Sequence, residues 1–276
     1  MRDPVQVAVT GPFDDPRSPA LRFLQEAARL GEVTVLLWPD DTARELDGKH
    51  KKFPLAERAY FLQALRYVTR VLPVTGPVAA HSLPRAPGFH PGLWVMEEAQ
   101  AGAAQRDFCE KAGLPWRVIG GEELRGFPPA ANPPAPAGAA RKKVIVTGTY
   151  DWLHSGHVRF FEEAAGLGDL YVVVGHDANI LLLKGAGHPL FPQEERRYMV
   201  QSIRFVTEAL ISTGQGWLDA APEIARLKPD IYAVNEDGDQ GGKREYCRDR
   251  GIEYRVLKRL PAPGLPRRSS TDLRGF

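Results

Sequence analysis

Cysteine, long apolar runs and an excess of one charge are all lacking in this sequence. Only two of the 276 residues are cysteines, Cys109 and Cys247, which is too few for a disulfide framework. No apolar run approaches the roughly twenty residues that cross a bilayer, and no charged and apolar leader follows Met1. Lysine and arginine number 36 against 34 aspartates and glutamates, so no charge excess favours nucleic acid. We therefore expect a cytoplasmic protein without a membrane or nucleic-acid partner.

The sequence repeats itself at a spacing of about 137 residues, which becomes about 138 after one inserted residue. Its composition, 43% hydrophobic and 25% charged, is that of a globular protein, so the repeat indicates two copies of one domain. Cys109 and Cys247 occupy one position of the two copies, which favours a packing role for both. The aligned pairs include Thr10-Gly11 with Thr147-Gly148, Asp14 with Asp151, residues 22–31 with residues 159–168, Phe53 with Phe191, Arg58 with Arg196, and Arg66 with Arg204.

A tract rich in proline, alanine and glycine, residues 127–140, separates the copies and is typical of a semi-stiff linker. We therefore expect domains at residues 1–126 and 141–276. Each copy alternates strand and helix patterns, which predicts an α/β fold of two tandem Rossmann-like domains, each a parallel sheet flanked by helices, with ligands at the carboxyl ends of the strands. In the second copy we expect strands near 143–147, 170–175, 209–212, 230–234 and 254–258, and helices near 157–167, 194–205, 217–227, 242–250 and after 269.

The most informative segment is an apolar strand that runs into a turn and then a helix with two histidines. Residues 143–147 form a short β-branched run that Gly148 ends. The unpaired N–H groups and positive dipole at the start of the following helix favour phosphate oxygens, and Gly156 lets the backbone approach closely. His154 and His157 can then reach one phosphate. This pattern predicts a nucleotide-phosphate site.

A histidine pair of this spacing has two other interpretations. Most histidines satisfy local hydrogen bonds or lie at the surface, so a structural role is the simplest alternative. A zinc site is disfavoured, because neither cysteine lies near a second ligand pair in the sequence. The placement on a strand, turn and helix favours phosphate binding over both.

Four segments, in order, resemble the nucleotidyltransferases of the H-x-G-H class, which include cytidylyltransferases and several adenylyltransferases. The resemblance covers most of residues 143–274 and implies a Rossmann-like nucleotidyltransferase domain. Its segments are TGTYDWLHSGH at residues 147–157, LLLKG at residues 181–185, FPQEERRYMVQSIRFV at residues 191–206 and RSSTDLR at residues 268–274.

The resemblance implies that a small phosphorylated acceptor attacks the α-phosphorus of a nucleoside triphosphate, with Mg²⁺ as the companion of the triphosphate and release of pyrophosphate. It assigns phosphate contacts to His154 and His157. It also implies that Lys184 places its positive charge across the attacked phosphorus, whereas without the resemblance the simplest interpretation of Lys184 is a solvated surface lysine. The β- and γ-phosphates fall to Arg268, Ser269, Ser270 and Thr271, for which a helix cap is the alternative. The implied nucleotide-binding loop comprises Thr147, Gly148, Thr149, Tyr150, Asp151 and Gly156, with Asp151 orienting the loop or the metal-bound phosphates.

The acceptor side is less sharply defined. Arg204 and Trp217 match positions near the substrate in the cytidylyltransferases, although the first copy keeps an arginine at Arg66, which suggests a structural role. A tryptophan at the start of an amphipathic helix is also a common core residue. Asn235 and Asp237 follow a strand at the ligand edge and are expected to contact the base or the acceptor, with a solvated acidic turn as the alternative.

The first copy lacks the phosphate-binding histidines. Arg17 and Ala20 stand where the second copy has His154 and His157, so we interpret residues 1–126 as a degenerate domain, or one that binds a different ligand. Cytidylyltransferases of the class are typically dimers. We therefore expect the first copy to replace a second subunit and form an internal pseudo-dimer, with further homo-oligomers left open.

The nucleotide base is indicated by two conflicting features. The R-F-V segment at residues 204–206 and Trp217 favour CTP, whereas the long closing segment, residues 259–271, is nearer to the I-S-S-T ending of adenylyltransferases. We predict a cytidylyltransferase that transfers CMP to a polyol, amino-alcohol or related phosphate. The alternatives are an adenylyltransferase that uses ATP and a non-catalytic nucleotide sensor.

Overall fold

The computed structural model describes residues 3–47, 52–75, 78–129 and 141–273, and the chain forms two compact units. The first unit is Met1–Gly126 and the second is Phe127–Phe276. Most of the proline-rich tract, residues 130–140, lies outside the described residues. Phe127, at the start of that tract, packs against Tyr198 of the second unit with ring centroids 5.5 Å apart.

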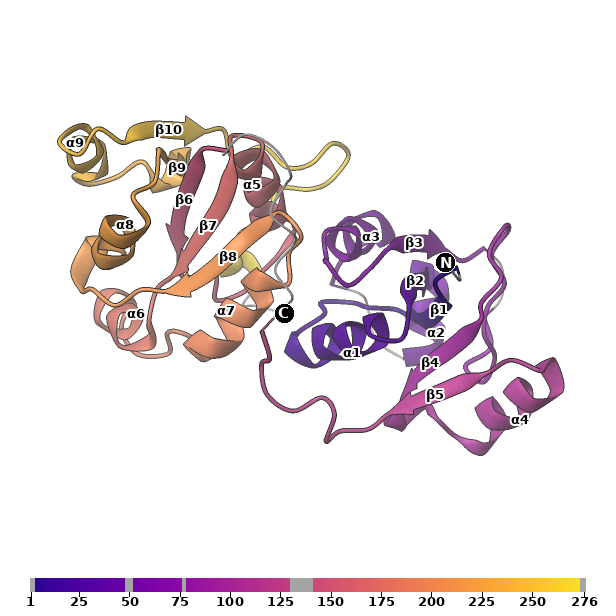
Figure 1. Ribbon diagram of the computed structural model, residues 1–276. Helices are drawn as coiled ribbons and strands as arrows, with labels where there is room; N and C mark the ends of the chain where they lie inside the picture. The colour runs from indigo at the N-terminus through magenta and orange to yellow at the C-terminus, as the bar shows by residue number, and fades with distance from the viewer. Residues whose placement is uncertain (1–2, 48–51, 76–77, 130–140, 274–276) are drawn as a thin grey trace. The chain divides into compact units, whose positions relative to one another are not determined.

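Each unit is built on a five-stranded sheet in which every strand pairing is parallel (Figure 1). The sheet orders are β3-β2-β1-β4-β5 and β8-β7-β6-β9-β10, which is the same topology twice. The predicted α/β class and parallel sheets are therefore confirmed. The strands of the first unit are β1 (Gln6–Gly11), β2 (Glu32–Leu37), β3 (Arg70–Pro73), β4 (Leu93–Glu97) and β5 (Trp116–Ile119); those of the second are β6 (Lys143–Gly148), β7 (Asp169–Val174), β8 (Val206–Ile211), β9 (Ile231–Asn235) and β10 (Glu253–Leu257).

Helices connect the strands and flank each sheet (Figure 1). Those of the first unit are α1 (Ser18–Ala28), α2 (Asp40–Asp47), α3 (Leu55–Gln63) and α4 (Ala103–Ala112), with the 3₁₀ turn η1 (Glu98–Gln100). Those of the second are α5 (Ser155–Ala165), α6 (Asp177–Lys184), α7 (Gln193–Gln201), α8 (Ala221–Leu227), α9 (Lys243–Arg248) and α10 (Ser270–Leu273), with η2 (Gly216–Leu218) and η3 (Glu236–Gly238). None of the described helices has the length and apolar character needed to span a bilayer.

The structure repeats in the register that the sequence repeat predicts. Helices α1 and α5 begin and end at aligned positions, as do α3 and α7. The first two strands also pair alike, with Gln6 beside Glu32 and Lys143 beside Asp169. Aligned residues of the two units can therefore be compared as structural equivalents.

A buried arginine anchors the same loops in each unit. Arg196 donates to the carbonyl oxygens of Thr149, Gly175 and Phe191 at 2.6–2.8 Å and pairs with Asp177 at 2.6 Å. Because the side chain is almost wholly buried, these bonds compensate the removal of its charge from water. The first unit repeats the network with Arg58, which donates to Pro12, Trp38 and Phe53 and pairs with Asp40. Because the first unit repeats this network without the two histidines, Arg196 belongs to the scaffold that the two units share.

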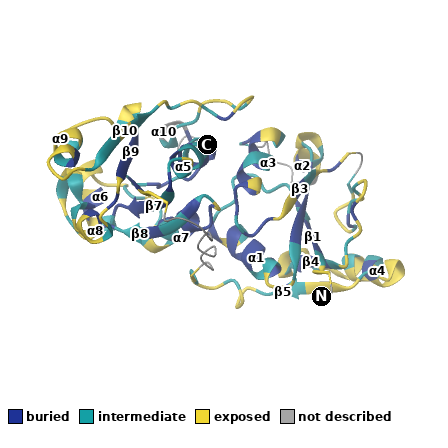
Figure 2. Cartoon of the chain, turned by 45° about the horizontal axis from the view of Figure 1, so that its top comes forward, coloured by how far each residue is buried: buried dark blue, intermediate teal, exposed yellow. Residues whose placement is uncertain are grey.

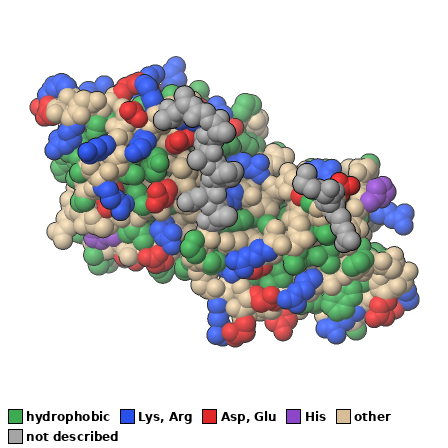
Figure 3. All heavy atoms as spheres, viewed as in Figure 1, with side chains coloured by type: hydrophobic (Ala, Val, Ile, Leu, Met, Phe, Trp, Pro, Cys, Tyr) green, Lys and Arg blue, Asp and Glu red, His purple; other side chains and the backbone are tan. Residues whose placement is uncertain are grey.

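Buried side chains lie along the central strands, and exposed ones lie mainly on the outer faces of helices and on loops (Figure 2). In the second unit, Ala220 just before α8, Ile224 of α8 and Cys247 of α9 pack on one sheet face. Burial raises the pKa of Cys247 to about 11, so its thiol stays protonated and serves as a small apolar group. Over the face of the molecule shown in Figure 3, positive and negative side chains are interspersed.

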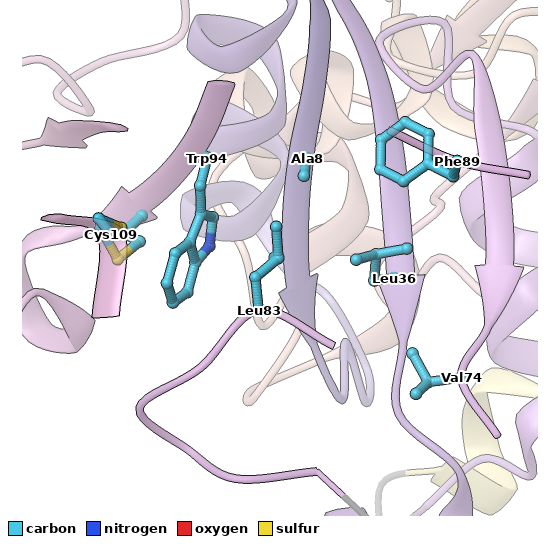
Figure 4. Close-up of a cluster of buried hydrophobic side chains, with 8 residues drawn as sticks. Ala8, Leu36, Val74, Leu83, Phe89, Trp94 and Cys109 are labelled. Carbon is cyan, nitrogen blue, oxygen red and sulfur yellow. The ribbon is translucent and has the colours of Figure 1, made fainter. Parts of the chain in front are cut away.

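The first unit covers the equivalent sheet face without a counterpart of α8. Leu83 and Phe89 of the segment between β3 and β4 pack there against Leu36, Trp94 and the rest of the cluster (Figure 4). The described part of this segment is not helical. The first copy thus keeps the strand order but departs from the second between its third and fourth strands.

The helices differ from the expectations at three places. Helix α6 was not expected, and the segment expected as a helix over 194–205 ends at Gln201. The helix expected near 217–227 begins at Ala221, after the 3₁₀ turn η2. The unexpected helix carries three exposed leucines, Leu181, Leu182 and Leu183, so it has no apolar stripe for a periodicity argument to find. Its start is instead fixed by polar bonds, which are described below.

Candidate active site

A cavity of about 730 Å³ opens at the carboxyl ends of the strands in the second unit. This is the edge at which parallel α/β sheets bind ligands. Eleven of the residues that the sequence pointed to line it: Thr147, Gly148, Thr149, Tyr150, Asp151, His157, Lys184, Trp217, Asn235, Asp237 and Ser270.

The ring of Tyr150 folds back over Gly148, the last residue of β6. A Cβ at Gly148 would lie 2.8 Å from the Tyr150 ring, closer than side chains pack. Tyr150 itself has a left-handed backbone with φ of 51°, which is strained for a bulky residue. The turn therefore places an aromatic ring on the floor of the cavity.

His154 caps helix α5 through its own ring. Its Nδ1 accepts a hydrogen bond from the Gly156 amide at 3.1 Å, so the neutral ring carries its proton on Nε2. A Cβ at Gly156 would lie 2.9 Å from this ring. Gly156 is thus required by the imidazole folded over it, and the first copy, which has Arg17 at the cap, tolerates Pro19 there.

His157 lies against His154, with ring centroids 4.0 Å apart, and faces the cavity. Its Nδ1 is buried and has no hydrogen-bond partner among the described residues. Burial, with smaller effects from the positive charges of Arg259 and Lys184, lowers the pKa of His157 from 6.5 to about 3. The ring is therefore neutral near pH 7, and its unpartnered nitrogen is available to a ligand.

The pKa of His157 predicts how stability depends on pH. Its value is lower in the folded than in the unfolded chain, so between pH 6.5 and about 3 the unfolded chain binds more protons. Stability therefore falls as the pH drops below 6.5. We expect the thermal midpoint of the wild type to fall more steeply between pH 7 and 5 than that of His157→Ala, measured by calorimetry. Parallel curves for the two proteins would contradict the lowered pKa.

Asp151 orients a loop of the scaffold. Its Oδ1 accepts hydrogen bonds from the backbone amides of Leu190 and Phe191 at 2.7 and 3.1 Å. In the first unit, Asp14 accepts from the equivalent amides of Lys52 and Phe53. Because this arrangement persists in the copy without histidines, it accounts for the loop-orienting role that was predicted for Asp151.

Lys184 is the last residue of α6, and polar bonds fix the start of that helix. The His176 ring accepts from the Asn179 amide at 3.2 Å and bonds the Gly214 carbonyl at 2.8 Å. The Asn179 side chain is buried and exchanges two hydrogen bonds with the backbone of Gly216, at 2.8 and 3.1 Å. These bonds join the helix that carries Lys184 to the turn that carries Trp217.

Trp217 forms an exposed aromatic wall of the cavity. Its side chain is 55% exposed, so it is not the core residue that its position also allowed. The indole packs on a glycine pair, and a Cβ at Gly242 would lie 3.3 Å from it. Leu183, 53% exposed, also lines the cavity. The arrangement offers an apolar wall to a flat ligand.

The predicted triphosphate segment lies beside the histidines. Arg268 lines a small pocket next to the cavity together with Gly156, and Asn235 lines both spaces. Arg259 pairs with Asp237 and donates to the Arg268 carbonyl at 3.2 Å, which ties this segment to the cavity rim. Ser270 lines the cavity and donates to the Trp152 carbonyl at 3.3 Å.

Ser269 and Thr271 are the two other residues predicted in this closing segment. Ser269 precedes α10, and its carbonyl accepts from the Leu273 amide at 3.3 Å. The side chain of Thr271 lies outside the described residues. The assignment of the segment to the β- and γ-phosphates stays a prediction.

Arg204 is not brought to this site. It precedes β8 and therefore lies at the amino ends of the strands, whereas the cavity opens at their carboxyl ends. Arg204 was expected within a helix over 194–205, but α7 ends at Gln201, so Arg204 lies beyond the helix. Within the second unit, the structure separates Arg204 from the cavity.

Several cavity residues were missed from the sequence. They include His188, Gln240 and Lys243, and Arg259 joins them through Asp237. Gln240 and Lys243 continue the loop of Asn235 and Asp237, so extending that segment would have found them. Burial lowers the pKa of Lys243 despite the carboxylates nearby.

The first unit has a different arrangement at the equivalent position. Trp38, the counterpart of Gly175, is 9% exposed and donates to Thr10 at 2.7 Å. Thr10 is the counterpart of Thr147, which lines the cavity of the second unit. An indole thus lies against the residue that faces the ligand space in the other copy.

No group of three His, Cys, Asp or Glu side chains able to hold a metal ion occurs in the described part of the chain. Two carboxylates of the cavity are already engaged, Asp151 with backbone amides and Asp237 with Arg259. A metal held mainly by phosphate oxygens is the kind that this donor set fits.

The parallel sheet, the helix start with two histidines and the cavity before it define a nucleotidyltransferase domain. Residues 145–275 match the cytidylyltransferase-like family. The chain belongs to this family, within the H-x-G-H nucleotidyltransferases, which confirms the resemblance seen in the sequence.

Several curated proteins similar to this chain are FAD synthases from archaea. The FAD synthase of Ferroglobus placidus is 40% identical over 120 residues, which are 42% of this chain and 75% of that protein. The FAD synthase of Methanocella paludicola is 33% identical over 135 residues, 48% of this chain and 93% of that protein. The FAD synthase of Pyrococcus abyssi is 37% identical over 128 residues, 45% of this chain and 84% of that protein. These names do not confirm the predicted use of CTP.

Proposed function

We propose that the second unit is an adenylyltransferase that transfers AMP from ATP to the phosphate of flavin mononucleotide and forms FAD. The observation that carries this proposal is the similarity to FAD synthases, at 40% identity over 75% of one of them. The cavity agrees with it, because the exposed faces of Trp217 and Leu183 suit a flat aromatic ring. The alternative of an adenylyltransferase that uses ATP is therefore preferred here to the predicted cytidylyltransferase that uses CTP.

The reaction needs no covalent enzyme intermediate. A phosphate oxygen of the flavin nucleotide attacks the α-phosphorus of ATP, the new P–O bond forms and the bond to the β-phosphate bridge breaks, which releases pyrophosphate. The attacking phosphate is already ionised near neutral pH, so no protein base is required. Catalysis then consists of positioning and of stabilising the charge that develops on the phosphate oxygens.

The proposed roles follow the geometry. His154 presents Nε2–H beside the start of α5, and His157 presents its unpartnered ring nitrogen to the same space. Lys184 approaches from the end of α6 as the cation across the attacked phosphorus. Arg268 and Ser270 hold the outer phosphates. Mg²⁺ would be carried on the phosphates of ATP and neutralise part of their charge.

We also propose that the first unit has no transfer site of its own. Its equivalents of the two histidines are Arg17 and Ala20, and Trp38 lies against Thr10. A buried indole there would have to move before a nucleotide entered.

The proposed reaction predicts a specific pair of substrates. We expect pyrophosphate release and FAD formation from ATP and flavin mononucleotide with Mg²⁺, measured by a coupled phosphate assay and by chromatography of the flavin product. CTP with the same acceptor, and ATP without an acceptor, serve as controls. Release from CTP with a polyol or amino-alcohol phosphate, and none from ATP with the flavin, would restore the cytidylyltransferase reading and overturn this proposal.

A further inference from the structure

Tyr150 carries a hydroxyl group that the fold does not use. The side chain is 6% exposed and lines the cavity, and its hydroxyl is buried without a hydrogen-bond partner among the described residues. A buried polar group without a partner lowers stability, so such groups are uncommon unless a ligand completes them. Packing of the aromatic ring therefore does not explain why this position carries a hydroxyl.

The first unit shows that the ring alone satisfies the fold. Phe13 is the counterpart of Tyr150 and has the same left-handed backbone, with φ of 44° against 51°. Its ring lies over Gly11 as the Tyr150 ring lies over Gly148. Phenylalanine is therefore fully compatible with this turn, and the hydroxyl adds nothing that the turn requires.

The hydroxyl occurs in the unit that also has the histidines. Tyr150 packs edge-on against His157, with ring centroids 5.4 Å apart. The first unit has Phe13 and Ala20 at these two positions, so it lacks both the hydroxyl and the imidazole. The Tyr150 hydroxyl and the His157 Nδ1 therefore belong to neighbouring side chains, and neither atom has a hydrogen-bond partner among the described residues.

We propose that the Tyr150 hydroxyl is a binding group that donates a hydrogen bond to a phosphate oxygen of the bound nucleoside triphosphate, beside His157. Burial raises the pKa of Tyr150 far above neutrality, so the hydroxyl keeps its proton and can donate it in a hydrogen bond to a phosphate oxygen. The turn that both units share holds the Tyr150 ring over Gly148 before a ligand arrives. The inference rests on the nucleotidyl transfer proposed above.

The test is Tyr150→Phe, which copies the residue of the first unit. We expect the Kd for ATP to rise and kcat/KM for ATP to fall by about 10- to 100-fold, the usual effect of losing a hydrogen bond to a charged group. The thermal midpoint should be equal to or above that of the wild type, because a buried hydroxyl without a partner has been removed. Titration calorimetry with ATP and with inorganic pyrophosphate gives the affinities.

Two matched variants separate this role from general effects of removing a hydroxyl. Tyr171→Phe changes a partly buried strand residue outside the cavity and should leave binding and the reaction unchanged. Tyr232→Phe removes a hydroxyl that bonds Thr147 at 2.8 Å, and it should lower the thermal midpoint. Equal affinity for ATP in Tyr150→Phe and the wild type, or a lower midpoint in Tyr150→Phe, would overturn the proposal. Since binding of ATP and pyrophosphate is measured directly, a wild type inactive on flavin mononucleotide would refute the proposed function without deciding the role of Tyr150.

Discussion

Replacing His157 with alanine is expected to lower pyrophosphate release by about 100- to 1000-fold, the range seen when a preorganised donor to a developing charge is removed. The imidazole faces the cavity, its Nδ1 has no partner among the described residues, and it stands beside the helix start where the phosphates are expected. The first unit carries Ala20 at the equivalent position of α1, so alanine is compatible with the local fold.

The fold of the His157→Ala variant should be intact at pH 7, and circular dichroism and thermal unfolding check this. The matched control is His81→Ala, which changes an exposed histidine of the first unit and should leave turnover unaffected. Unchanged turnover in a folded His157→Ala protein would overturn the assignment of this site as catalytic. Turnover lost equally in both variants would show that the effect does not come from the cavity.

The strand, turn and helix of the phosphate loop were predictable because their signals are local. A β-branched run, a glycine and a histidine cap stand within residues 143–157, and each acts on its neighbours in the chain. The repeat extended this prediction to the first unit, because equal spacing of equivalent residues implies equal connections. The common strand order of both sheets confirms that reasoning.

Other parts of the site depend on contacts between distant residues and left no periodic signal. Helix α6 is stabilised at its start by His176 and Asn179, which bond the backbone near Gly216 from more than thirty positions earlier in the chain. Trp217 packs on a glycine pair that follows η3, more than twenty positions later in the chain, and the rest of its side chain is exposed. Arg204 shows the reverse case, since a motif match suggested a site residue and the end of α7 places it at the other edge of the sheet.

The choice of nucleotide base shows a different limit. The segment from Thr147 to His157 is proposed to bind phosphates, which all nucleoside triphosphates share, so this motif alone does not distinguish CTP from ATP. The base is recognised by groups outside the motif, and the Asn235 Oδ1 is buried in the cavity without a partner among the described residues. The substrate pair proposed above tests the choice of base directly.

Replacing Arg196 with alanine is expected to destabilise the second unit by about 3–5 kcal/mol, because three carbonyl groups around a buried side chain lose their hydrogen bonds at about 1–3 kcal/mol each. The side chain donates to three carbonyl groups and pairs with Asp177, all of which lose their partner at once. A domain of this size has a total stability of about 5–15 kcal/mol, so the variant retains little. One of those carbonyls belongs to Thr149 of the nucleotide-binding loop, so turnover should be lost at lower urea concentrations than in the wild type.

The chain supplies its own control in Arg58→Ala, which breaks the equivalent network in the first unit. We expect each variant to sensitise its own unit, detected by limited proteolysis in increasing urea with the fragments mapped by mass. Turnover at low urea should survive Arg58→Ala, because every proposed catalytic group belongs to the second unit. If Arg58→Ala abolishes turnover while the second unit resists proteolysis, the first unit contributes to catalysis, and its assignment as a degenerate copy without a part in the reaction is wrong.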